Sequence, residues 1–182
     1  MTANLYDIPV TTIDGRATTL REHAGKVLLI VNVASKCGLT PQYAALEKLH
    51  ETLSGRSFAV LGFPANDFAG QEPGSEAEIQ AFCTATYGVR FPMYAKIRVT
   101  GPDQHPLYRH LTMAAPDATG REAMEASLRG YGLEPAAKPA VLWNFEKFLV
   151  DRHGRVVGRF APDTAPDAPA LLSAIEAEVA KA

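Results

Sequence analysis

The sequence has little of several features that would point directly to a function. It holds only two cysteines, no run of about 18 apolar residues, and a net charge of only −2. Two cysteines are too few for a disulfide scaffold, and this charge offers no basic surface for nucleic acid. The N-terminal sequence carries charges and a proline where a signal peptide needs an apolar core. We therefore expect a cytoplasmic protein that binds neither a membrane nor nucleic acid.

Motifs that bind the common cofactors are missing as well. The five histidines are scattered, with neither an HExxH segment nor the paired cysteines typical of zinc sites. No GxxxxGK[ST] segment is present to bind phosphate groups. The residue three positions after Cys37 is Thr40, so the sequence has no CxxC dithiol pair. From these absences we expect that the protein binds no metal ion and no organic cofactor.

What the sequence does have is the composition of an ordinary folded domain. Of its 182 residues, 47% are hydrophobic and 21% are charged, which is enough to build a substantial core. No repeat or linker interrupts the chain. We therefore expect one domain over residues 1–182.

Hydrophobic periodicity predicts an α/β architecture. Apolar runs at 28–33 and 57–63 are typical of buried strands, and the amphipathic segment 41–53 between them is typical of a helix. A strand, helix and strand in this order form a crossover that makes the two strands parallel. Hairpins are expected at 8–19, around Asp14-Gly15, and at 145–161.

Further helices are expected at 75–87, 104–113 and 168–180. The first of them begins with a capping pair, Ser75 and Glu78. Segment 113–141 is rich in Ala, Pro and Gly and is the least regular part of the chain, with a turn or two of helix expected at 122–128.

Cys37 lies where the strand at 28–33 gives way to the helix at 41–53. Thr40-Pro41 resembles a helix start, with the Thr40 hydroxyl as the cap and proline at the first helical position. The free N–H groups of that helix start and the neighbouring Lys36 both favour a thiolate, which is the nucleophilic form of cysteine. From this stretch alone, a buried cysteine with a purely structural role is equally consistent with the sequence.

Four segments resemble the signature segments of the glutathione peroxidases, in the cysteine rather than the selenocysteine form. They are NVASKCGLTPQY, LGFPANDFAGQEPGS, FCTATYGVRFP and WNFEKFLVD, and they occur in the family's order. The resemblance extends from about Leu5 to the C-terminal helix. It implies a thioredoxin-like fold, with a central mixed β-sheet flanked by helices and an N-terminal β-hairpin. It also implies a peroxidase that reduces hydrogen peroxide and organic hydroperoxides.

The resemblance assigns roles to individual residues. Cys37 corresponds to the peroxidatic cysteine, and Gln71, Trp143 and Asn144 complete a catalytic tetrad. Their N–H groups are suited to stabilise the sulfur anion and the leaving oxygen. Cys83 corresponds to the resolving cysteine of the thioredoxin-dependent members, although glutathione is also a candidate reductant. Because Cys83 lies on the apolar face of the helix at 75–87, it reaches Cys37 only if that helix unwinds, and a core cysteine is the alternative.

Two positions depart from many relatives. Ala65 stands where a third cysteine is common, and Asp67 replaces a neutral amide, with an effect on the site that we leave open.

Two other functions remain open. One is a peroxide sensor or redox relay that passes oxidation to a partner protein, and the other is a binding module in which Cys37 is inert. We expect a monomer, although longer insertions at segment 113–141 accompany oligomers in some relatives.

Overall fold

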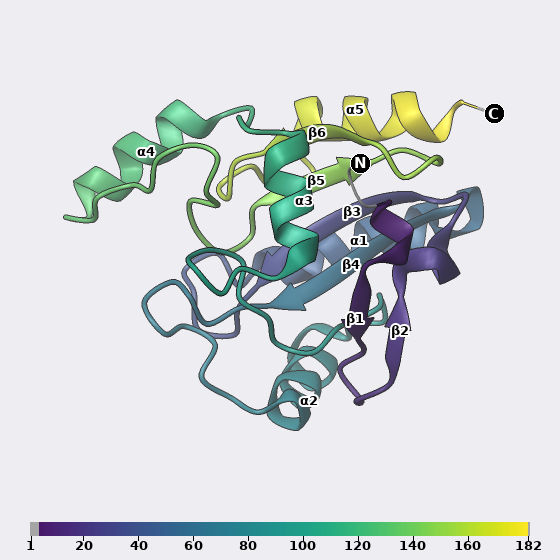
Figure 1. The fold of residues 1–182 in the computed structure, drawn as a ribbon, viewed down its shortest axis with the longest axis horizontal. Coiled ribbons are helices and arrows are strands. Elements are labelled where there is room, and N and C mark those ends of the chain that lie inside the picture. Colours follow the sequence, from purple (N-terminus) through teal and green to yellow (C-terminus); the bar gives the residue numbers. More distant parts are fainter. Residues whose placement is uncertain (1–3, 182) are drawn as a thin grey trace.

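The computed structural model describes residues 4–181 and contains a four-stranded mixed sheet of order β4-β3-β5-β6 (Figure 1). Strands β3 (Val27–Val33) and β4 (Phe58–Pro64) are parallel, as the crossover predicted. Strand β5 (Lys147–Val150) runs antiparallel to β3, and β6 (Val156–Phe160) runs antiparallel to β5. The predicted hairpin at 145–161 is therefore confirmed.

The N-terminal hairpin is a separate two-stranded sheet made of β1 (Pro9–Thr11) and β2 (Ala17–Thr19). Its turn includes Gly15, whose φ of 94° lies in the left-handed region that glycine adopts without strain. Short 3₁₀ turns, η1 (Leu5–Asp7), η2 (Leu20–His23) and η3 (Ser54–Arg56), complete the connections.

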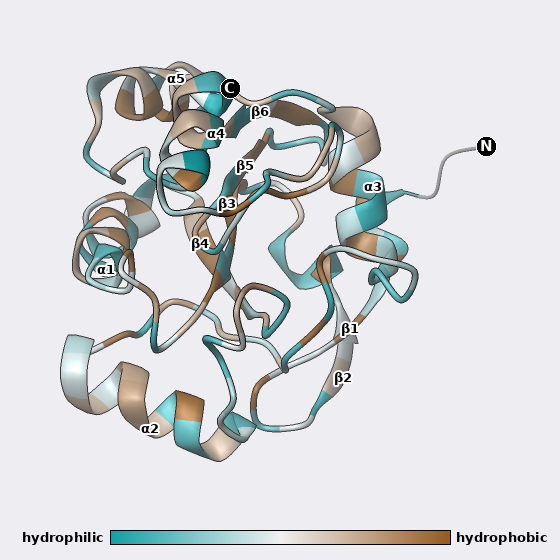
Figure 2. Ribbon diagram, turned by 90° about the vertical axis from the view of Figure 1, so that its left-hand side faces the viewer, coloured by the Kyte–Doolittle hydropathy of each residue, from teal (hydrophilic) through white to brown (hydrophobic). Residues whose placement is uncertain are grey.

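Helices cover both faces of the sheet because both faces are apolar (Figure 2). Alternate residues of β3 pack on opposite sides, as the period of a strand requires. One face is covered by α1 (Gln42–Leu53), α2 (Glu76–Tyr87) and α5 (Pro169–Val179). The other is covered by α3 (Pro106–Ala114) and the N-terminal hairpin. No helix among residues 4–181 is long and apolar enough to cross a membrane.

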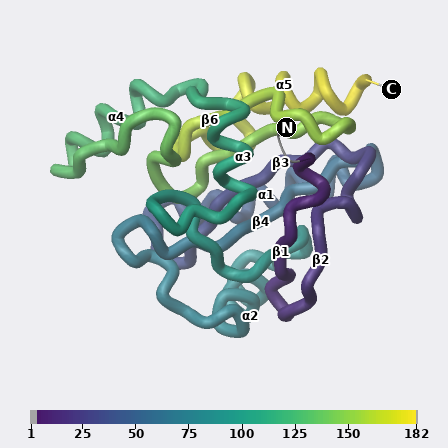
Figure 3. The backbone as a smooth tube through the Cα atoms, in the orientation of Figure 1, coloured from purple at the N-terminus to yellow at the C-terminus, as the bar shows by residue number. Residues whose placement is uncertain are grey.

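Segment 113–141 is more regular than its composition indicated. It contains α4 (Arg121–Gly130), a helix of 10 residues that the sequence predicted only as a turn or two. Figure 3 shows α4 projecting beyond the sheet, after which the chain turns back towards β5. Met124 and Leu128 are buried, and they pack with Leu142 and Trp143. One face of α4 is therefore fixed to the residues that precede β5.

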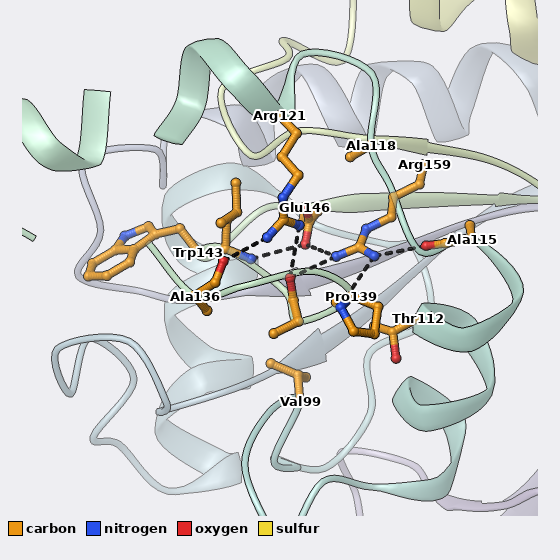
Figure 4. Close-up of polar contacts among 12 residues, drawn as sticks. Val99, Thr112, Ala115, Ala118, Arg121, Ala136, Pro139, Trp143, Glu146 and Arg159 are labelled. Carbon is orange, nitrogen blue, oxygen red and sulfur yellow. Dashed lines mark hydrogen bonds and ion pairs between the residues drawn. The ribbon is translucent and has the colours of Figure 1, made fainter. Parts of the chain in front are cut away.

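Two buried arginines hold this segment in place, and one of them, Arg159 of β6, attaches it to the sheet (Figure 4). The guanidinium of Arg159 donates to the carbonyls of Ala115, Pro139 and Ala140, and it pairs at 3.1 Å with the fully buried carboxylate of Glu146. Arg121, in the first turn of α4, donates to the carbonyls of Ala136 and Ala140. These contacts satisfy carbonyls of an irregular segment, which also pairs with β6 through a parallel bridge between Thr119 and Phe160.

Candidate functional site

Three loops meet at one edge of the sheet and carry four of the predicted site residues. The chain leaves β3 at Val33 and β4 at Pro64, and it enters β5 at Lys147. Because β3 is parallel to β4 and antiparallel to β5, these three strand ends lie at the same edge. Cys37 follows β3 and Gln71 follows β4, whereas Trp143 and Asn144 precede β5.

A tight turn held by Thr40 positions Cys37. The Thr40 hydroxyl accepts a hydrogen bond from the Cys37 N–H at 2.9 Å and donates to the Ala34 carbonyl at 2.8 Å. The prediction that this hydroxyl caps the helix was therefore wrong, because the turn already occupies it. Helix α1 begins at Gln42, with Pro41 at its N-cap and no side-chain cap.

The sulfur of Cys37 has a backbone donor that the sequence did not reveal. The Leu39 N–H donates to Sγ of Cys37 at 3.3 Å, within the same turn. Cys37 is mostly buried but retains 9% of its surface exposed. A backbone donor has no signature in the sequence, since it depends only on how the chain bends after Cys37. The donor stabilises negative charge on the sulfur.

Gln71 and Asn144 are joined side chain to side chain. Nδ2 of Asn144 donates to Oε1 of Gln71 at 2.9 Å, and Asn144 is fully buried. The backbone of Gln71 is also fixed, because its carbonyl accepts from the Lys36 N–H at 3.0 Å. Since Oε1 is the atom that accepts from Asn144, the amide group of Gln71 keeps its own N–H donors for another partner.

Trp143 is held through its backbone and its ring. Its carbonyl accepts from Nδ2 of the buried Asn32 at 3.1 Å, and its indole packs against Phe68 with ring centroids 5.3 Å apart. The indole is only half-buried.

Cys37, Gln71 and Trp143 line one cavity of about 560 Å³. Asn144 does not line the cavity, but its side chain donates a hydrogen bond to Gln71, which does. The rest of the wall comes from the Cys37 and Gln71 loops, from α4 and the chain that follows it, and from the loop after β6. These residues are Gly38, Leu39, Ala69, Met124, Ser127, Leu128, Tyr131, Leu133 and Asp163. The contribution from α4 was not expected from the sequence.

Cys83 lies outside this cavity, on the buried face of α2. It is 1% exposed and belongs to the same core cluster as Cys37, and both are free thiols. Burial raises the pKa of Cys83 to about 11; the neighbouring Tyr43 hydroxyl counteracts part of that rise, and the Glu72 carboxylate adds to it. Burial also raises the pKa of Glu72. At neutral pH, Cys83 is thus a protonated thiol within a folded helix.

Asp67 points away from Cys37. Its Oδ2 accepts from the Val99 N–H at 2.7 Å, and Oδ1 lies 3.8 Å from Nη1 of Arg98. Asp67 lines a different pocket, together with Lys96 and Arg98. Its carboxylate is therefore bound to the chain after Tyr94 rather than turned towards the thiol.

Comparisons with known proteins identify the family of this chain. The family model described as Glutathione peroxidase matches residues 5–112. The Thioredoxin/glutathione peroxidase BtuE of Escherichia coli is 52% identical over 94% of this chain and 95% of its own length. The chain belongs to the glutathione peroxidase family. Membership makes it a thiol peroxidase, an oxidoreductase that reduces hydroperoxides.

Two other relatives extend the comparison within the family. The Hydroperoxy fatty acid reductase gpx1 of Synechocystis is 46% identical over 90% of this chain and 89% of its own length. The crystal structure of T. cruzi GPX1 superimposes with a TM-score of 0.70 at 32% identity, covering 97% of each chain. A thioredoxin-family thiol:disulfide interchange protein from Chlorobium tepidum, 15% identical, shares the fold with a TM-score of 0.62 over 98% of this chain and 97% of its own. The predicted thioredoxin-like fold is confirmed.

Replacing Thr40 tests the turn that holds Cys37. Thr40→Val keeps the shape but leaves the Cys37 N–H and the Ala34 carbonyl buried without their partner. We expect a loss of about 1–3 kcal/mol in the free energy of unfolding and slower oxidation of Cys37. Urea unfolding and stopped-flow oxidation measure the two effects. Thr40→Ser retains the hydroxyl and should behave nearly as the wild type; equal losses in both variants would contradict the role of the hydroxyl.

Proposed function

We propose that Cys37 is the nucleophile that reduces hydrogen peroxide and organic hydroperoxides in this chain. One observation carries the proposal: the sulfur that accepts the Leu39 N–H shares a cavity with the side chains of Gln71 and Trp143. A cysteine with a merely structural role needs neither an opening to solvent nor a set of N–H donors around it. An inert Cys37 in a binding module is therefore disfavoured.

The chemistry follows from the groups that line the cavity. The Cys37 thiolate attacks the terminal peroxide oxygen, the O–O bond breaks, and the sulfur becomes a sulfenic acid. The leaving oxygen takes a proton and departs as water or an alcohol. N–H groups of Gln71 and Trp143 stabilise the charge on sulfur and on the leaving oxygen without competing as nucleophiles. Asn144 acts as a positioning residue, because it orients the amide of Gln71.

Cys83 is proposed to resolve the sulfenic acid. Its sulfur bonds to Sγ of Cys37, the S–O bond breaks, and the departing hydroxide leaves as water with the Cys83 proton. Because the Cys83 thiol is packed in the core and protonated, α2 has to open locally before this bond forms. Exposure to solvent also returns the pKa of Cys83 towards its ordinary value, which increases the thiolate fraction.

An internal disulfide favours thioredoxin as the reductant, with glutathione as the other candidate. The name of the Escherichia coli relative includes both.

A second function, a peroxide sensor or redox relay, is favoured if α2 opens slowly, since a persistent sulfenic acid then has time to react with a partner protein. We further propose a monomeric, one-domain protein in the reducing cytoplasm, where two free thiols persist.

Replacing Gln71 tests the amide donor. We expect Gln71→Ala to slow the oxidation of Cys37 by about 10- to 1,000-fold, because charge on the sulfur and the leaving oxygen loses a stabilising donor. Stopped-flow mixing with hydrogen peroxide gives the rate, and Cys37→Ser should show no reaction at all. The matched control is Gln104→Ala, which removes an amide side chain that does not line the cavity. An unchanged rate in Gln71→Ala would remove Gln71 from the site.

The resolving role of Cys83 predicts a specific product. Reduced protein treated with an equimolar amount of hydrogen peroxide should form a Cys37–Cys83 disulfide, located by peptide mass mapping. Opening α2 exposes Ile79 and Phe82, at about 1.5–3 kcal/mol for each side chain that becomes fully exposed, so α2 should become more sensitive to protease. In Cys83→Ser the first oxidation should survive while turnover with thioredoxin collapses. A stable sulfenic acid in the wild type, with Cys83 still alkylatable, would refute this role.

A further inference from the structure

The wall of the Cys37 cavity facing α4 is largely apolar. Met124 and Leu128 of α4 line it, and Tyr131 and Leu133 extend it along the chain that follows. Trp143, in the loop that precedes β5, lines the same space. A hydroperoxide whose terminal oxygen reaches Sγ of Cys37 therefore has its organic group beside this wall.

Two of the side chains at this wall are unusually exposed. Tyr131 is 84% exposed and Leu133 is 40% exposed. Among the described residues, the only other large hydrophobic side chains exposed to this degree are Met113 and Val157, and neither lines the cavity. Exposed apolar surface is unfavourable in water, and its concentration beside a reactive thiol indicates a binding surface.

The charges at the cavity favour a neutral ligand group. Asp163 is the one acidic side chain among the described residues that line it, and neither lysine nor arginine is among them. An anionic group would meet a carboxylate there and no opposite charge. Lys36, which precedes Cys37 in the sequence, lines a separate pocket with Ser35, Glu72 and Phe82.

The wall is held in place before any ligand arrives. Arg121 fixes the first turn of α4 to the carbonyls of Ala136 and Ala140, and Arg159 holds the latter carbonyl as well (Figure 4). Met124 and Leu128 are 6% and 5% exposed and pack with Trp143. A ligand that binds to a preformed surface loses less free energy in ordering the protein.

We propose that Tyr131 and Leu133 bind the organic group of bulky, apolar hydroperoxides and thereby set the substrate preference of Cys37. The proposal rests on Cys37 being the peroxidatic residue. Hydrogen peroxide has no organic group, so its reaction at the same sulfur is independent of both side chains.

A double variant, Tyr131→Ser with Leu133→Ser, separates the two kinds of substrate. Both side chains are exposed, so the fold should be retained, which thermal unfolding checks. The second-order rate of Cys37 oxidation is measured by stopped flow with cumene hydroperoxide and with hydrogen peroxide. We expect the rate with cumene hydroperoxide to fall about five- to thirtyfold, and the rate with hydrogen peroxide to change by less than about twofold. Met113→Ser, at another exposed apolar position that does not line the cavity, should change neither rate.

Other outcomes would overturn the proposal. Equal losses with both peroxides would show that the double change disturbs the thiol itself, and unchanged rates would show that the surface does not contact the substrate. If oxidation is normal but reduction by thioredoxin slows, the surface belongs to the reductant. A wild-type protein that reacts with neither peroxide would instead refute the proposed function at Cys37, and this proposal with it.

Discussion

The hydrogen bonds of the buried Asn32 hold the site together. Asn32 lies near the end of β3 and is fully buried. Its carbonyl accepts from the Phe145 N–H at 2.6 Å, and its side chain donates to the Trp143 carbonyl at 3.1 Å. These two bonds continue the contact between β3 and β5 beyond their ladder and fix Trp143 and Asn144 beside the Cys37 loop. Asn144 then donates to Gln71, so two buried amides, Asn32 and Asn144, connect β3 with the loops that carry Trp143 and Gln71.

The two cysteines lie in different surroundings. Cys37 lies in a turn closed by Thr40 and next to a wall anchored by buried arginines. Cys83 lies on α2, which encloses a pocket of about 400 Å³ together with the loop of Glu72. The Glu72 carboxyl group lies at this pocket, and burial raises its pKa. The proposed disulfide with Cys37 therefore requires α2 to open locally while the sheet stays intact.

Local sequence signals predicted the strands and helices whose formation depends on residues close together in the sequence. The strands and α1 lie within about two residues of their predicted bounds, and Ser75 caps α2 by accepting from the Glu78 N–H at 3.2 Å. The regularity of segment 113–141 was underestimated, because this segment is held by hydrogen bonds from Arg159, which is distant in sequence. The resemblance named the residues that converge at the sheet edge. It did not reveal the Leu39 donor, because that donor is a backbone N–H. It also did not reveal the exposed wall at Tyr131, because the exposure of Tyr131 indicates a binding surface only when the structure places this residue at the Cys37 cavity.

The central claim, that peroxide reacts at a sulfur beside Trp143, is tested most directly by fluorescence, because Trp143 is the only tryptophan in the sequence. Mixing reduced protein with excess hydrogen peroxide should change the fluorescence in a fast phase whose rate rises in proportion to peroxide concentration. This phase should be absent in Cys37→Ser. A phase that persists in Cys37→Ser, or whose rate does not depend on peroxide concentration, would contradict the account.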